Sequence, residues 1–158
     1  MPLNPATQDA KAFEAIGLGF RVDKATATLP QTAAGDLFRV AGGRVLVKMI
    51  VGEVTTIIQA IANATKLTFD PVDAGATQDL CATLDITGDA VGVMYHISGT
   101  PADALRDNLN FARGTLIAAP LILKPGDIML DCAGSATGNV KWSIWYIPVE
   151  EGGNIAAL

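Results

Sequence analysis

The sequence has few residues of the kinds that carry chemistry. Among 158 residues there are two cysteines, one histidine and only 6% aromatic residues. Two cysteines and one histidine supply too few soft ligands for a structural metal site. Aromatic side chains this sparse do not provide a stacking platform for sugars or bases. We therefore expect neither a metal site nor stacking-based recognition, and we predict no cofactor.

Positive charge is also scarce. Eleven lysines and arginines stand against sixteen aspartates and glutamates, which gives a net charge of −5 and a pI of about 4.6. The basic residues are spread along the chain without forming a run, so they provide no surface that neutralises a row of phosphates. We therefore expect no binding of nucleic acid.

Long apolar runs and targeting signals are missing as well. The most apolar stretch is interrupted by Lys48, Glu53 and Gln59, so it falls short of the roughly 20 residues that a spanning helix needs. The N-terminal residues lack a basic segment followed by an apolar one, which a signal peptide would have. We expect no membrane association and a chain made in a cytoplasm. There Cys81 and Cys132 would be buried thiols, although oxidising surroundings would allow a disulfide.

Apolar residues, in contrast, are plentiful. They make up 50% of the chain, and the mean hydropathy is +0.36. These values exclude a disordered chain. They also indicate more apolar surface than a monomer needs, which favours a homo-oligomer or a component of a larger assembly.

The stretch 44–67 organises the rest of the sequence. β-Branched residues crowd its first two-thirds, and such residues fit a pleated, half-buried surface better than a helix. The pair Gly52-Glu53 lies in the middle, where a bulge or tight bend would let the chain change direction. The pattern predicts two successive strands with a break at Gly52.

Further strands follow at short intervals. Residues 80–87 alternate between apolar and polar and predict a hairpin with 91–97, whereas Thr100-Pro101 predicts the start of a brief helix. Residues 140–148 are apolar on both sides, which is typical of a strand that is buried or meets a partner. About eight short strands predict a single all-β domain over 36–150, a β-sandwich or jelly-roll-like fold.

The two ends have a different composition. Residues 1–35 predict an N-terminal arm, with a possible short helix over 7–16 and a weakly alternating stretch over 21–29. This arm is either a mobile tail with an edge strand or an extension onto a neighbouring subunit, anchored by Phe13, Ile16 and Phe20. Residues 151–158 predict a loose C-terminal tail.

Candidate catalytic groups are isolated. The only histidine, His96, could be combined with Ser98 or Ser143 and with Asp85, but no nucleophile-elbow motif accompanies them. We interpret His96 as a structural residue. The carboxylates that could form acid–base pairs have no spacing that fixes their separation; they are Asp85 with Asp131, and Asp127 with Glu53. The sequence predicts no enzyme.

Three stretches resemble the capsid decoration, or cement, proteins of tailed bacteriophages. They are VLVKMIVGEVTTIIQAIANATKL, DLCATLDITGDAVGVMYHISGTPADAL and GNVKWSIWYIPVEEG, and the resemblance covers residues 38–152. It rests on whole segments, without a short diagnostic motif. It implies a β-rich virion protein, made in the bacterial host cytoplasm, that binds the exterior of an icosahedral capsid. Its partner would be the major capsid protein, and it implies no catalytic residues.

Two other classes of protein stay open. One is a receptor- or glycan-binding module of a fibre or lectin-like kind, and the other is a small β-sandwich hydrolase. For the capsid interpretation, we expect contacts from the N-terminal arm and from the Trp145 side of the last long strand. Self-association as a homodimer or homotrimer is also expected. The predicted contact residues are Phe13, Ile16, Phe20, Trp145 and Ile147.

Overall fold

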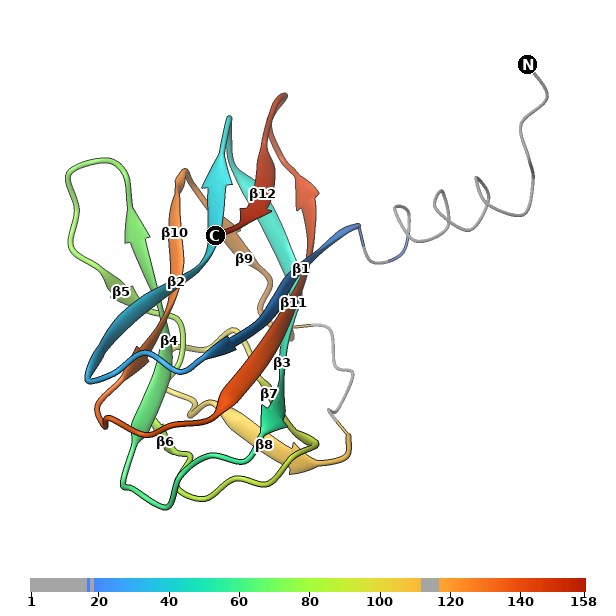
Figure 1. Cartoon of the computed structure of the whole chain (residues 1–158). Helices are drawn as coiled ribbons and strands as arrows, with labels where there is room; N and C mark the ends of the chain where they lie inside the picture. Colours follow the sequence, from blue (N-terminus) through green and yellow to red (C-terminus); the bar gives the residue numbers. More distant parts are fainter. Residues whose placement is uncertain (1–16, 18, 112–116) are drawn as a thin grey trace.

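A computed structural model describes residues 17, 19–111 and 117–158 of the chain (Figure 1). Strand accounts for about 56% of the structure, in two antiparallel sheets, and the described ranges contain no helix element. The prediction of an all-β fold is confirmed. The possible helix over 7–16, with Phe13 and Ile16, lies outside the described residues.

The first sheet, here called sheet A, is built around the longest strand. In spatial order its path is β1 (Phe20–Thr28), β11 (Asn139–Pro148), β3 (Val45–Thr56), β7 (Val93–His96) and β8 (Arg106–Leu109), and β9 (Leu121–Leu123) also pairs with β3. Every pairing in this sheet is antiparallel.

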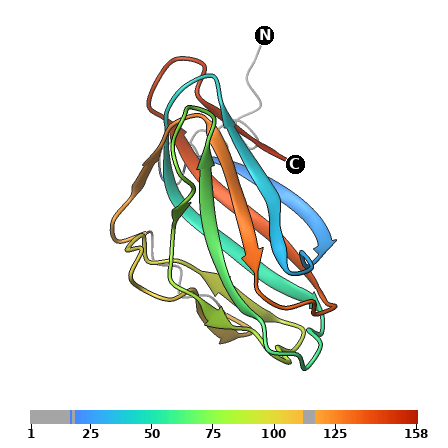
Figure 2. The ribbon, with the colours of Figure 1, turned by 90° about the vertical axis from the view of Figure 1, so that its left-hand side faces the viewer.

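The second sheet, sheet B, is built around β10. Its path is β12 (Asn154–Ala157), β2 (Ala33–Ala41), β10 (Gly126–Cys132), β4 (Ala64–Pro71) and β5 (Gln78–Asp79), and β6 (Leu84–Asp85) also pairs with β4. These pairings are antiparallel too. In Figure 2, β2, β10 and β4 lie side by side.

One hydrophobic core lies between the two sheets. Along β11 and β10, buried residues alternate with more exposed ones, because successive side chains of a strand point to opposite faces. As expected, Val140, Trp142, Ile144 and Tyr146 form the buried side of β11. The Trp142 ring stacks on Tyr95 with ring centroids 6.2 Å apart. Such an aromatic pair adds to the stability that area burial alone provides.

The predicted break at Gly52 is wrong. β3 continues through Gly52 to Thr56, and the chain leaves the sheet only after it. A Cβ atom at Gly52 would lie 2.8 Å from two atoms of the Trp142 ring. The glycine therefore makes room for the indole of the neighbouring strand, and it does not bend its own strand.

The predicted hairpin of 80–87 with 91–97 is also wrong. Only residues 84–85 form a strand there, which pairs with β4 in sheet B, whereas β7 pairs with β3 in sheet A. The chain crosses between the sheets at this point, so the two segments do not pair. The brief helix expected at Thr100 is a turn, in which the Asp103 amide donates to the Thr100 carbonyl at 3.0 Å.

The sheets include parts of both ends that the sequence placed outside the main domain. Residues 20–28 form an edge strand, as one of the two interpretations had it, and 33–35 begin β2. Likewise, 154–157 pair with β2. Residues 20–28, 33–35 and 154–157 thus belong to the folded sheets. Within the described residues, no helix has the length and the apolar character that crossing a membrane requires.

Candidate functional site: the outer face of sheet A

The face of sheet A that points away from the core is rich in apolar side chains. The strand register places them next to one another, because directly opposed residues lie about 4.5–5.5 Å apart. Ile147 pairs with Leu46 and Leu46 with Ile122, while Trp145 pairs with Met49. The apolar members of this surface, called the sheet A face below, are Leu46, Met49, Val51, Met94, Ile122, Trp145 and Ile147.

The local sequence explains how these residues come to one face. In β11 the core side takes residues 142, 144 and 146, so 143, 145 and 147 point outward. The register shifts between Trp145 and Tyr146, which leaves Lys48 as an extra residue on β3. This bulge puts Lys48 and Met49 in succession at partly exposed positions. All members of the sheet A face are partly buried except Ile122, which is 60% exposed.

Polar groups border the sheet A face along β1. The guanidinium of Arg21 lies 5.3 Å from the centre of the Trp145 ring, and its Nε donates to Asp23 at 2.8 Å. The Ser143 hydroxyl donates to the same carboxylate at 2.5 Å. The hydrogen bond from Ser143, followed by those from Arg21, holds the pKa of Asp23 below its usual value. These bonds fix Arg21 over the indole.

A shallow hollow of about 200 Å³ lies on this face, between Arg21, Val51, Met94 and Trp145. The ion pair between Lys141 and Glu53, at 2.8 Å, closes one side of it. An apolar centre that contains tryptophan and has arginine at its border has the composition of a protein interface. The arrangement therefore suits the binding of another protein surface.

The structure places those predicted contact residues that it describes on different sides of sheet A. Trp145 and Ile147 lie together on the sheet A face. Phe20 does not join them: its ring packs against Tyr146, with centroids 5.9 Å apart, and it is 54% exposed. Because Tyr146 points to the core side, Phe20 lies on the other side of the sheet. Phe13 and Ile16 fall outside the described residues.

Several residues of the face were missed from the sequence. Leu46, Met49, Val51, Met94 and Ile122 were read as parts of strands, without a functional role. A signal was present, since β3 has apolar residues on both of its sides, just as β11 does. Two such strands, once paired, produce a sheet that is apolar on both faces.

The side chains considered for catalysis do not converge. The Ser98 hydroxyl donates to Asp103 at 2.7 Å, and that of Ser143 to Asp23. His96 is buried, at 5% exposure, next to Val51 in the strand register. Ser98 and Ser143 are therefore engaged with carboxylates other than Asp85, the aspartate that the sequence offered.

Carboxylates expected as acid–base pairs have other partners. Asp85 accepts hydrogen bonds from the Thr87 hydroxyl at 2.5 Å and from the main-chain N–H of Asn63 at 3.0 Å, and these bonds lower its pKa. Glu53 pairs with Lys141 across the strands. Similarly, Asp127 accepts two hydrogen bonds from the Arg39 guanidinium. The bonded carboxylates act here as structural groups.

The two cysteine thiols were also considered for chemistry. Cys81 and Cys132 are both free and about 1% exposed, and burial raises the pKa of each thiol. Such thiols are less reactive than exposed ones. Across the part of the chain that the structure describes, no three histidine, cysteine, aspartate or glutamate residues are grouped so that they could hold a metal ion.

Comparisons with known proteins gave no relative. A scan against protein-family models, a search of curated proteins and a search of solved structures each found no match to this chain.

Proposed function

We propose that this chain is a structural virion protein that binds the outside of an icosahedral phage capsid and stabilises contacts between major capsid subunits. The sheet A face is the capsid-binding surface in this proposal. The observation that carries it is the apolar outer face of a sheet, centred on Trp145 and Ile147. Two of the three stretches that resemble decoration proteins contain β3 and β11, the central strands of that face.

The physical logic fits a protein that acts as a clamp. A shell under pressure from packaged DNA resists rupture better when an added protein buries surface across subunit boundaries. A face built on paired strands is rigid, so little conformational entropy is lost when it binds. Many copies, or a homodimer or homotrimer, would turn a modest contact into firm retention. A jelly-roll-like sandwich is part of the same proposal.

A glycan-binding role has less support. Sugars bind to aromatic rings by stacking on their faces, and the best placed ring on the sheet A face is that of Trp145. Arg21 already lies over this ring, 5.3 Å from its centre, and it is fixed by Asp23. The geometry thus favours a flat protein contact over a sugar.

The test mixes purified protein with phage capsids that lack it. Retention on the capsid and the temperature at which the shell bursts are measured for the wild type and for two variants. Trp145→Asp places a charge in the sheet A face, whereas Met129→Asp places one on a partly exposed apolar position of the outer face of sheet B. Both variants must show the wild-type far-ultraviolet circular dichroism.

We expect the wild type to bind and to raise the bursting temperature. Trp145→Asp should weaken binding by about 30-fold or more, the size of a hot-spot loss, and Met129→Asp should bind like the wild type. Failure of the wild type to bind capsids, or equal losses in the two variants, would contradict the proposal. Deleting residues 1–16 tests the remaining predicted contacts, Phe13 and Ile16.

A further inference from the structure

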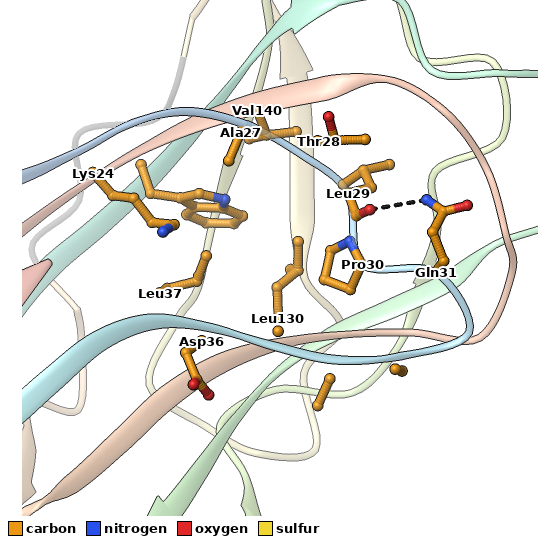
Figure 3. Close-up of a pocket in the computed structure, with 14 residues that line it drawn as sticks. Lys24, Ala27, Thr28, Leu29, Pro30, Gln31, Asp36, Leu37, Leu130 and Val140 are labelled. Atoms are coloured by element: carbon orange, nitrogen blue, oxygen red, sulfur yellow. Dashed lines mark hydrogen bonds between the residues drawn. The ribbon is translucent and has the colours of Figure 1, made fainter. Parts of the chain in front are cut away.

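A cavity of about 360 Å³ opens between the two sheets where β1 leads into β2 (Figure 3). It lies at one edge of the core, on the inner side of sheet A, whereas the sheet A face is on the outer side. Its floor is apolar and buried, and the side chains that form it are Leu29, Leu37, Leu130, Val140 and Trp142. This volume is within the range of small-molecule sites, which are concave and mostly apolar.

Small residues at the end of β1 and at the start of β2 create this space. Ala27, Ala33, Ala34 and Gly35 line the cavity where larger side chains would fill it. Protein cores are otherwise close-packed, and an unfilled apolar space forfeits the contacts of its lining. An apolar ligand on this floor would restore those contacts.

The wall of the cavity is held in place by specific contacts. A Cβ atom on Gly35 would lie 2.6 Å from Cγ of Pro30, so the close approach of the β1–β2 connection to β2 requires glycine. The Gln31 amide nitrogen donates to the carbonyls of Leu29 and Ala136, each at 2.9 Å. Since one of these acceptors lies in the connection before β11, the bonds join the β1–β2 turn to that connection. The cavity is therefore preformed.

A single cation lines the cavity. Lys24 extends from β1, and its ammonium points into the space, whereas the carboxylate of Asp36 points away from it (Figure 3). The ammonium donates a hydrogen bond to the main-chain oxygen of Leu158. Within the described residues, no aspartate or glutamate forms an ion pair with Lys24. The cavity thus combines an apolar floor with one positive group that meets an oxygen.

We propose that this cavity binds a small amphipathic carboxylate, with its hydrocarbon chain on the apolar floor and its carboxylate on Lys24. The carboxylate competes with the Leu158 oxygen for the ammonium of Lys24, and it forms an ion pair with that ammonium. The chain length that fits is set by the closed end of the cavity. This site is independent of the sheet A face and of capsid binding.

The first experiment titrates the full chain with straight-chain acids from hexanoate to dodecanoate, below their micelle concentrations. Binding is followed by the fluorescence of Trp142 in a Trp145→Phe background, because the sequence has only these two tryptophans. We expect the affinity to rise roughly fourfold for each added methylene until the cavity is full, and then to level off. Decanol and decylamine should bind more weakly than decanoate.

Variants separate the cavity from non-specific adsorption. Lys24→Met should abolish the preference for decanoate over decanol, and Lys24→Arg should keep it. Ala27→Leu fills the cavity from β1 and should reduce decanoate affinity at least tenfold, whereas Ala25→Leu, on the same strand outside the cavity, should not. Lys141→Met, which removes a cation elsewhere, serves as the second control. Thermal unfolding of each variant verifies that it is folded.

Three results would overturn the proposal. They are binding of decylamine as tight as that of decanoate, an affinity that keeps rising over the whole series of acids, and equal effects of Ala27→Leu and Ala25→Leu. Absence of binding at millimolar decanoate would overturn it as well. Each of these outcomes leaves the capsid proposal untouched, since that one depends on a different face.

Discussion

The outer faces of the two sheets differ in their apolar content, although each covers the same core from one side. On sheet A the outward positions of β3 and β11 carry a group of apolar side chains around Trp145, beside the ion pair of Lys141 with Glu53. On sheet B they carry ion pairs: Arg39 with Asp127 and Lys66 with Asp79, each at 2.8 Å. Met129 is an apolar exception on that face.

This difference indicates which face is suited to contact with solvent. An antiparallel sheet commonly has one face on the core and one that is solvated, with polar side chains on the solvated face. Sheet B follows this pattern. Sheet A departs from it at the sheet A face, where outward side chains such as Trp145 and Ile147 would be as suitable for a core. The simplest physical reason for such a face is a partner that covers it.

The two tryptophans of β11 give the largest expected difference. Trp142 is 2% exposed and stacks on Tyr95 in the core, so Trp142→Ala should lower the free energy of unfolding by about 3–5 kcal/mol. Trp145→Ala, three residues along on the sheet A face, should cost less than about 1 kcal/mol. Denaturant unfolding of both variants measures this. Equal losses would mean that Trp145 is a core residue.

A smaller effect is expected on sheet B. Lys66 and Asp79 pair across β4 and β5, and the side chain of Asp79 is half exposed. The coupling energy of Lys66→Ala and Asp79→Ala in a double-mutant cycle should be about 0.2–1 kcal/mol and should fall as salt is added. A coupling that is large and independent of salt would contradict the account of this face as one that water covers.

The smallest effect concerns pH and the border of the sheet A face. The hydrogen bond from Ser143 lowers the pKa of Asp23 below its ordinary 3.8 in the folded chain. Its carboxylate therefore contributes stability that is complete above the unfolded-state value and is lost as the pH falls through the lower folded-state value. Asp23→Asn should lower Tm slightly at neutral pH and not at about pH 2. Ser143→Ala should show the same trend; a Tm difference that persists in acid would refute this assignment.

Much of the fold could be predicted from residue patterns. The all-β class and the buried side of β11 follow from alternation, and the edge strand 21–29 was one of two interpretations. The register could not be predicted, because it depends on which strands meet across the molecule. Gly52 shows why: its role is set by the ring of Trp142, ninety positions away in the sequence. The hairpin predicted for residues 80–87 was wrong for a related reason. Apolar and polar residues alternate there, yet only two of the residues form a strand.

The candidate site could be predicted only in part. Trp145 and Ile147 were found because β11 is apolar on both sides, which is visible in the sequence. Their neighbours on β3, β7 and β9 become part of the same surface only through the pairing of these strands. The cavity at Lys24 could not be predicted at all, because small residues such as Ala27 and Ala34 carry no pattern that indicates an unfilled core.

Methionine oxidation offers the most direct test of the difference between the faces. Met49 and Met94 lie on the sheet A face and Met129 on the outer face of sheet B, and all three are partly exposed. Hydroxyl-radical footprinting of the free and the capsid-bound protein compares their conversion to sulfoxide by mass spectrometry. We predict that capsid binding protects Met49 and Met94 and leaves Met129 unchanged. Protection of Met129 without protection of Met49 and Met94 would contradict the central claim.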